Sequence, residues 1–133
     1  MAAESVAEQL ITVGEPVVVH GKSPSTDYCV VFEDDGETGY LYAVDLAKSE
    51  QMILDAMHIY NVSDVTDRHK PSAVRLGWSR DGLKAMLTIN GYTHAIFDFD
   101  AQSGYCRTGF PPSNESWSLK GHDWSENALD LFD

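Results

Sequence analysis

The chain has 133 residues, 43% of them hydrophobic, and its 21 acidic and nine basic residues give a formal net charge of −12. This length fits a single domain, residues 1–133, that buries its own core. The charge argues against binding to nucleic-acid backbones or anionic membrane surfaces. It is compatible with a basic protein or a cationic ligand as the partner, and the alternative is that it only keeps the protein soluble.

The first ten residues mix Ala, Glu and Gln with a few aliphatic residues, which predicts a short frayed helix or a disordered end. Residues 1–6 have neither the basic start nor the apolar run of a secretory signal. No stretch approaches the roughly 20 apolar residues that span a bilayer. We therefore expect a cytoplasmic protein in which Cys29 and Cys106 are reduced and buried within strands.

Three β-strands are predicted next, at 17–20, 28–32 and 40–44, because β-branched and aromatic residues cluster there. The turn between the last two strands is acidic and contains Glu33, Asp34, Asp35 and Glu37. These acids lack the spacing of an established calcium loop, so we interpret the turn as a solvated hairpin tip without a metal. Its carboxylates are candidate contacts for a basic partner.

The segment 49–62 is compatible with two structures. As a helix it would begin at Ser49 and carry one apolar stripe of Met52, Ile53, Ala56, Met57 and Tyr60. As a strand from Ile53 to Tyr60 it would be apolar on both faces except at Asp55 and His58, as expected of a central strand. A polar connector, 63–70, follows.

The most specific pattern is a four-stranded antiparallel meander between about residues 73 and 108. Asp81-Gly82 and Asn90-Gly91 favour two-residue hairpin turns, and 101–104 forms a looser third turn. The predicted strands are 73–79, 83–89, 92–99 and 105–108. We therefore expect an α+β, mainly β fold built on an antiparallel sheet, with the N-terminal strands and one or two short helices.

The two tight turns also predict which residues lie opposite each other. Leu76 should face Leu87, Leu87 should face His94, and Ala85 should face Ile96. Because cross-strand partners share a face, one face is apolar and carries Val74, Leu76, Trp78, Ala85, Leu87, Ile89, Tyr92 and Ile96. The opposite face carries Arg75, Ser79, Lys84, Met86, Thr88, Thr93, Ala95, Phe97 and Phe99.

Three polar residues of the meander are candidate site residues. His94 and Asp98 share a face but lie roughly 13 Å apart along the strand, which excludes a direct catalytic pair. A four-residue third turn places Asp98 opposite Arg107 and predicts a cross-strand ion pair. We interpret His94 as a hydrogen-bonded core residue and the ion pair as structural. The alternative is a small-ligand or hydrolase site formed by His94, Asp98 and Arg107.

The C-terminal part begins with a Gly-Pro-rich loop, 109–114, and Ser125 can cap a short helix, 126–132. Trp117 and Trp124 flank a polar stretch, where they either anchor a protein interface or cover one end of the core. The histidines have no paired metal-ligand spacing, and phosphate-loop and other familiar catalytic signatures are absent. We expect neither metal nor cofactor.

Three runs of residues carry a resemblance to a known family: FEDDGETGY within 31–40, ILDAMHIYNV at 53–62 and GYCRT at 104–108. With these runs the chain resembles a family of small uncharacterised bacterial proteins over about 17–132. The function of that family is unknown, so the resemblance implies no catalytic residues. The expected function is a non-enzymatic acidic binding protein, specifically an immunity protein that neutralises a basic toxin by covering its cationic surface.

Overall fold

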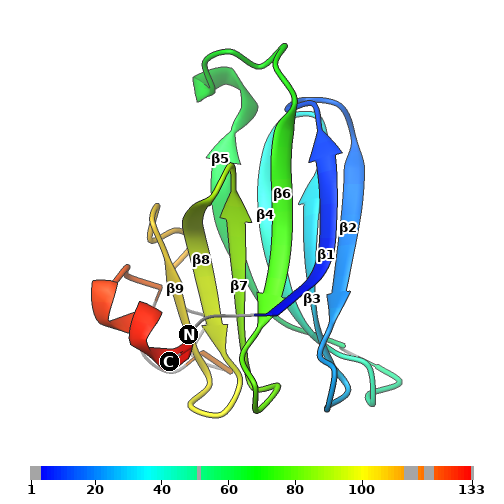
Figure 1. The fold of residues 1–133 in the computed structure, drawn as a ribbon, viewed down its shortest axis with the longest axis vertical. Coiled ribbons are helices and arrows are strands. Elements are labelled where there is room, and N and C mark those ends of the chain that lie inside the picture. The colour runs from blue at the N-terminus through cyan, green and yellow to red at the C-terminus, as the bar shows by residue number, and fades with distance from the viewer. Residues whose placement is uncertain (1–3, 51, 113–116, 119–121, 133) are drawn as a thin grey trace.

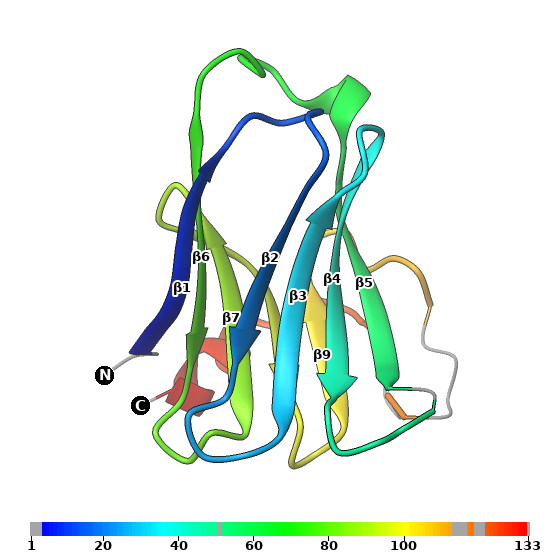
Figure 2. The same ribbon diagram turned by 90° about the vertical axis from the view of Figure 1, so that its right-hand side faces the viewer.

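The computed structural model describes residues 4–50, 52–112, 117–118 and 122–132. Within these ranges nine β-strands form two antiparallel sheets that pack face to face as a β-sandwich (Figure 1 and Figure 2). The expectation of a mainly β fold built on antiparallel sheet is therefore confirmed. None of the helical segments in these ranges has the length and apolar character needed to cross a membrane.

Five strands form one sheet in the order β1-β6-β7-β8-β9, with bounds β1 (Glu4–Ile11), β6 (Ser72–Trp78), β7 (Lys84–Ile89), β8 (Tyr92–Asp98) and β9 (Ser103–Cys106). Four strands form the other sheet in chain order, with bounds β2 (Val17–Lys22), β3 (Tyr28–Asp34), β4 (Thr38–Asp45) and β5 (Ile53–Asn61). The helical segments are two short 3-10 helices, η1 (Val62–Asp64) and η2 (Glu126–Phe132).

The strands predicted at 17–20, 28–32 and 40–44 are confirmed as parts of β2, β3 and β4. The ambiguous segment 49–62 contains a strand, β5, because the open edge of β4 supplies a backbone partner along most of its length. Asp55, Met57 and Ile59 alternate into the buried side of β5.

The prediction of a helix or disorder for the first ten residues is wrong over residues 4–10, which form most of β1, while residues 1–3 lie outside the described ranges. Only Ile11 of this strand is buried. The strand forms because its backbone pairs with β6, whose N–H and C=O groups would otherwise form an open sheet edge. The side-chain composition of residues 4–11 therefore gives little indication that they form a strand.

The first hairpin of the meander has the predicted register, with Leu76 opposite Leu87 and Trp78 opposite Ala85. The second hairpin does not, because a β-bulge interrupts it. Thr88 pairs with Thr93, but Leu87 pairs with Ala95, which leaves His94 as the extra residue.

The bulge exchanges the two faces of β8 beyond His94. Ala95 and Phe97 therefore point into the sandwich, and Ile96 points to the outer side, where it packs in a separate apolar cluster. The predicted pairing of Leu87 with His94 and of Ala85 with Ile96 is wrong, since Ala85 lies opposite Phe97. A single inserted residue reverses every later assignment in a strand, because side chains alternate with period two.

The third turn also differs from the prediction, because Asp98 pairs with Ser103 and the turn comprises 99–102 rather than 101–104. The carboxylate of Asp98 accepts hydrogen bonds from the backbone amides of Asp100 and Ala101, each over 3.0 Å. Asp98 thus stabilises its own turn. The predicted cross-strand ion pair with Arg107 does not form.

The core lies between the sheets and contains inward side chains of both, including Phe32, Leu41, Trp78, Leu87 and Phe97, all fully buried. The indole nitrogen of Trp78 donates to the backbone oxygen of Gly21 over 3.0 Å, which ties the five-stranded sheet to β2. Gly21 permits this close approach, because a Cβ atom there would lie 2.9 Å from that of Leu76. Cys29 and Cys106 are free and buried, as expected.

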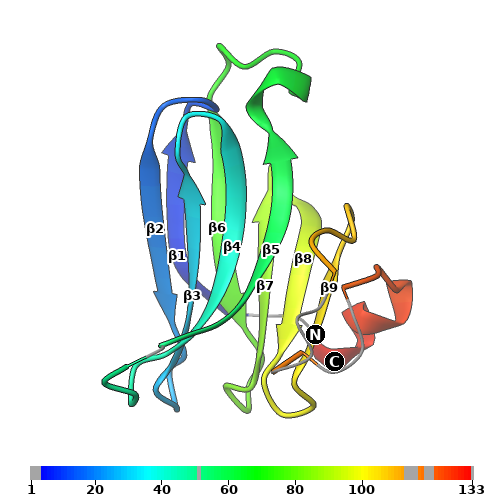
Figure 3. The ribbon, with the colours of Figure 1, turned by 180° about the vertical axis from the view of Figure 1, so that it is seen from behind.

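The chain covers the outer face of β7, β8 and β9 in the five-stranded sheet with its own C-terminal residues. Ala128 and Phe132 of η2 pack against Ile96, whose neighbours Met86 and Tyr105 extend the cluster. Figure 1 and Figure 3 show η2 in red beside β8 and β9. The predicted short helix at 126–132 is confirmed as a 3-10 helix, and Ser125 precedes it with its carbonyl accepting from the Ala128 amide.

The substitution Leu87→Ala tests the core assignment. Leu87 is fully buried at the centre of the meander, so its truncation should lower the free energy of unfolding by about 2–5 kcal/mol, measured by urea denaturation. The neighbouring residue Thr88 is only partly buried and points to the opposite face, so Thr88→Ala should cost much less. Equal costs for the two substitutions would contradict the assignment.

Candidate functional site

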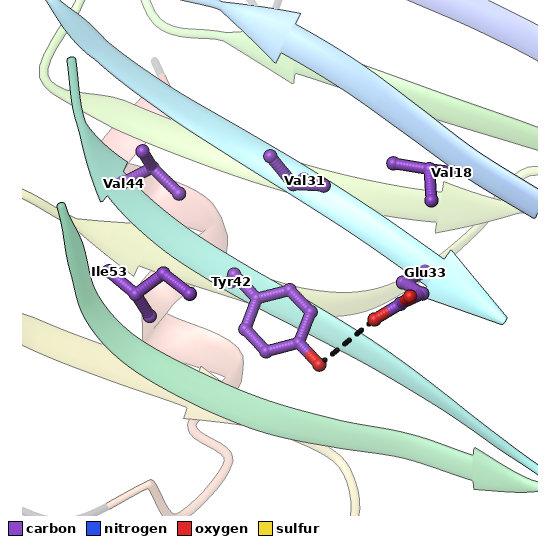
Figure 4. Close-up of a pocket in the computed structure, with 6 residues that line it drawn as sticks. All are labelled: Val18, Val31, Glu33, Tyr42, Val44 and Ile53. Atoms are coloured by element: carbon purple, nitrogen blue, oxygen red, sulfur yellow. Dashed lines mark hydrogen bonds between the residues drawn. The ribbon is translucent and has the colours of Figure 1, made fainter. Parts of the chain in front are cut away.

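The outer face of the four-stranded sheet carries an apolar patch at positions where solvent-facing side chains are ordinarily polar. This sheet-face patch consists of Val18, Val31, Glu33, Tyr42, Val44 and Ile53. Its residues come from all four strands and surround a shallow hollow of about 310 Å³ (Figure 4). Ile53 is 60% exposed and Val18 is 46% exposed, so these two apolar side chains contact water, whereas Val44 is buried.

The strand register explains why these side chains converge. Val31 lies opposite Tyr42, and Val44 lies opposite Ile53, so apolar neighbours stand side by side on one face. The Tyr42 hydroxyl donates to a carboxylate oxygen of Glu33 over 3.2 Å, as Figure 4 shows. Burial and the negative charge of Glu33 raise the pKa of the Tyr42 phenol, which therefore stays protonated.

Aromatic rings continue the patch toward the edge strand β5. Tyr40 stacks beside Tyr42 with 6.1 Å between ring centroids, and it meets the His58 ring edge-on at 5.5 Å. His58 in turn contacts the half-exposed ring of Phe110 at 5.9 Å. The backbone amide of His58 donates to the Phe110 carbonyl over 2.8 Å, which fixes this ring against β5.

Asp34, one of the four acids that were expected to face a partner, does not face the solvent. Asp34 is completely buried and accepts hydrogen bonds from the Gly14 and Gly36 amides, each over 2.8 Å, and from the Tyr60 hydroxyl over 2.6 Å. The interpretation of the whole turn as a solvated tip is therefore wrong at Asp34. This carboxylate is an internal acceptor that joins β3 to β5 and to the loop before β2.

The other three acids are accessible around one end of the patch. Glu33 is partly exposed within it, and Asp35 and Glu37 are exposed in the turn between β3 and β4. Hydrogen bonds from the backbone amides of Thr38 and Glu37 lower the pKa of Asp35, so its negative charge persists under mildly acidic conditions. These three acids form a negative margin beside an apolar centre.

Trp117 and Trp124 both pack against the chain itself. Trp117 meets the rings of Phe97 and Phe99 edge-on at 6.1 and 5.5 Å, so it covers one side of the core. Trp124 stacks against the guanidinium of Arg107, which lies 3.8 Å from the centre of its ring. Trp117 packs against the core between the sheets, whereas Trp124 belongs to the separate apolar cluster with Ile96 and η2.

The alternative trio of His94, Asp98 and Arg107 is not assembled. Asp98 lies at the end of β8 opposite to His94 and is engaged in its turn. The backbone amide of Arg107 donates to the His94 carbonyl, but the guanidinium is held between the rings of Tyr92 and Trp124. It also forms an ion pair with Glu126 at 3.0 Å.

A buried pair that the sequence did not reveal joins the C-terminal segment to β5. Nε2 of His122 lies 2.7 Å from a carboxylate oxygen of Asp55, and the side chains are only 1% and 4% exposed. Nδ1 of His122 contacts the carbonyl oxygen of Pro111. A carbonyl only accepts, so Nδ1 must carry a proton, and an ionised Asp55 then requires a doubly protonated ring.

Burial would by itself lower the pKa of His122. The hydrogen bonds to Asp55 and Pro111 and the negative charges of Asp55 and Asp123 outweigh that effect, so the pKa of His122 is raised. Both ring nitrogens are occupied by the protein, so the pair is suited to holding the chain together and not to proton transfer with a substrate. Within the described ranges, His, Cys, Asp and Glu side chains form no group of three or more that could hold a metal ion.

Comparison with known proteins assigns the chain to a family. A family model described as "Uncharacterized protein conserved in bacteria (DUF2251)" matches residues 11–133. The chain belongs to this family. The resemblance to a family of uncharacterised bacterial proteins is thereby confirmed.

An uncharacterized protein of Haemophilus influenzae (strain ATCC 51907 / DSM 11121 / KW20 / Rd) is similar to this DUF2251 chain, with 44% identity over 84 residues. The aligned part covers 63% of this chain and 52% of the relative, so it spans about half of the relative's length. No solved structure matches the chain.

The buried pair predicts how stability depends on pH. Folding raises the pKa of His122 above its ordinary value of 6.5, so the stabilisation is fully present below pH 6.5 and is lost as the pH rises through the folded-state value. The substitution His122→Gln should cost about 3–5 kcal/mol of unfolding free energy at pH 6, because it leaves Asp55 buried without its cationic partner. The cost should shrink at higher pH.

Urea denaturation of both proteins between pH 6 and pH 9 provides the measurement. The matched control is His20→Gln, which removes an exposed histidine from β2. A constant cost of His122→Gln across this range would show that the pair carries no ionic stabilisation.

Proposed function

We propose that this DUF2251 protein is a non-enzymatic binding protein that holds a basic protein partner on the outer face of its four-stranded sheet. The observation that carries the proposal is the sheet-face patch, which the described helices and strands leave uncovered (Figure 2). Contiguous apolar surface of this kind is characteristic of protein interaction sites. Covering it removes apolar area from water and stabilises the complex.

The two outer faces of the sandwich support this assignment by their contrast. On β7 and β8 of the five-stranded sheet, Met86 and Ile96 pack with η2 of the same chain, while Leu10 of its edge strand β1 stays exposed. On the four-stranded sheet, Val18 and Ile53 stay exposed, and Tyr40, Tyr42 and Phe110 add aromatic surface of the type enriched at interfaces. A bound partner would cover the apolar residues on the four-stranded sheet, as η2 covers Ile96 and Met86 on the five-stranded sheet.

Charge supports a basic partner. The chain carries a net charge of −12, and Glu33, Asp35 and Glu37 lie at or beside the patch. A partner with an apolar centre and Lys or Arg at its margin would be both steered toward this face and matched to it. A second copy of the same chain would bring another charge of −12, which opposes self-association through this face.

The specific role that we propose within this class is that of an immunity protein neutralising a basic toxin. A sheet face with an apolar centre and an acidic margin is suited to covering a cationic surface without chemistry of its own. The alternative of a hydrolase using His94, Asp98 and Arg107 has less support, because Asp98 and the Arg107 guanidinium are engaged elsewhere.

Affinity capture from the source bacterium tests the location of the surface. The wild-type chain, Ile53→Lys and Leu10→Lys serve as baits, since Leu10 is 70% exposed on β1 of the other sheet and receives the same charge change. A basic protein should be retained by the wild type and by Leu10→Lys, and lost by Ile53→Lys. Equal retention by both variants would place the surface elsewhere, and recovery of no basic protein would contradict the proposal.

The electrostatic part has its own test, made on the captured complex. The double substitution Asp35→Lys with Glu37→Lys should slow association more than it speeds dissociation, because exposed charges act mainly on encounter. The association rate of the wild type should fall steeply as salt is added. Surface plasmon resonance at several salt concentrations measures both rates, and an association rate independent of salt would exclude steering.

A further inference from the structure

A second opening lies at one end of the sandwich, between the edge of the β7–β8 hairpin and the connector that joins β5 to β6. It has a volume of about 540 Å³, which falls in the range of small-molecule sites. Its walls include Val13, Tyr60, Lys70, Ile89, Asn90 and His94. These residues come from the loop before β2, from both sheets and from the connector, and none of them belongs to the sheet-face patch.

His94 reaches this pocket because of the bulge, which makes it the extra residue of β8. Within the described chain its ring contacts the edge of Tyr92 at 5.2 Å but has no hydrogen-bond partner, contrary to the sequence expectation of a hydrogen-bonded core histidine. Burial, with the nearby charge of Arg107, lowers the pKa of His94. The ring is therefore neutral near pH 7 and offers one donor and one acceptor.

Two further polar groups in the walls have part of their hydrogen-bonding capacity already used. Tyr60 donates its hydroxyl proton to Asp34, which leaves its oxygen as an acceptor. Asn90 accepts from the Ala73 amide through Oδ1 over 2.9 Å, which leaves its NH₂ group as a donor. The walls thus combine aliphatic surface from Val13 and Ile89 with a few directional donors and acceptors.

The formal charges in the walls balance, since Lys70 and Asp67 contribute one of each sign. The net charge of −12 disfavours the approach of an anion. A cation near Asp67 would be repelled by the positive charge of Lys70, which also lines the pocket. We propose that this pocket binds a small, electrically neutral molecule with an apolar body and an amide-like hydrogen-bonding end. The body would lie against Val13 and Ile89, and the polar end would bond to His94.

Three ring-matched probes test the charge class: benzamide, benzoate and benzylamine in its protonated form. Each is titrated into the full chain at pH 7.5 while the histidine ring resonances are followed by NMR. We expect benzamide to shift the His94 resonances in a saturable manner, and benzoate and benzylammonium to shift them much less. The exposed rings of His20 and His69 serve as internal controls and should not respond.

Two substitutions test the location. With binding followed through the methyl resonances of Val13 and Ile89 in the pocket walls, His94→Phe should weaken benzamide binding about tenfold, the loss expected when one hydrogen bond is removed. Thr66→Trp, at an exposed connector position that lines the pocket, should block binding while His94 is retained. His20→Phe is the matched control and should leave binding unchanged.

Each remaining outcome would overturn the proposal. No saturable shift of His94 with any probe means that the opening is not a site of this kind. A larger response to benzoate or benzylammonium means that the ligand class is wrong. Unchanged benzamide binding in both His94→Phe and Thr66→Trp means that the probe binds elsewhere.

Discussion

A two-layer β-sandwich buries the inner face of each sheet and leaves two outer faces, which a chain must make polar or cover. The arrangement of the C-terminal residues and of the apolar side chains on the two sheets follows from this constraint. The outer face of the five-stranded sheet contains Ile96 and Met86, and η2 covers them. The outer face of the four-stranded sheet contains Val18, Val31, Tyr42 and Ile53, and the described helices and strands leave it uncovered. The apolar residues of the second face are accounted for if another molecule covers them.

Contacts of its described residues hold the C-terminal segment at the buried side of β5 and at one side of the core. Its residue His122 is bound to Asp55 at the buried side of β5, and Trp117 packs on Phe97 and Phe99 at the side of the core. Beyond these anchors the chain turns to the five-stranded sheet, where Trp124 stacks on Arg107 and η2 begins. The buried ion pair of His122 with Asp55 and the cation–π contact of Arg107 with Trp124 therefore place η2 on the five-stranded sheet. The described helices and strands leave the outer face of the other sheet uncovered.

The features that the sequence predicted are those encoded by neighbouring residues. The two turns at Asp81-Gly82 and Asn90-Gly91, the first hairpin register and the strands 17–20, 28–32 and 40–44 follow from turn chemistry and composition. The predicted pairing of β7 with β8 is wrong from His94 onward, because a bulge shifts the register there. The sequence does not show this bulge, since the strand is apolar on both faces. The strand β1 was missed for a related reason, since its pairing with β6 depends on backbone groups and not on side chains.

The site was less accessible from the sequence than the fold. The acidic turn and His94 were noticed, but their environments depend on distant residues. Asp34 is buried because Tyr60 and Gly14 supply its hydrogen bonds, and Asp55 and His122 are 67 positions apart. The apolar outer face was missed because it requires the pairing of four strands to bring Val18, Tyr42 and Ile53 together. The sequence did contain one indication of this face, namely the Val and Tyr residues at alternate positions of 28–32 and 40–44.

The outer face of the four-stranded sheet is the binding surface that we propose. Methyl-resolved NMR of the isotope-labelled chain in complex with its captured partner measures this directly. The account predicts that saturation transfers from the partner to the methyl groups of Val18, Val31, Val44 and Ile53, and that those of Val6 and Leu10 on β1 stay unaffected. Transfer to Val6 and Leu10, or to Leu129 and Leu131 of η2, with the patch unaffected, would contradict it.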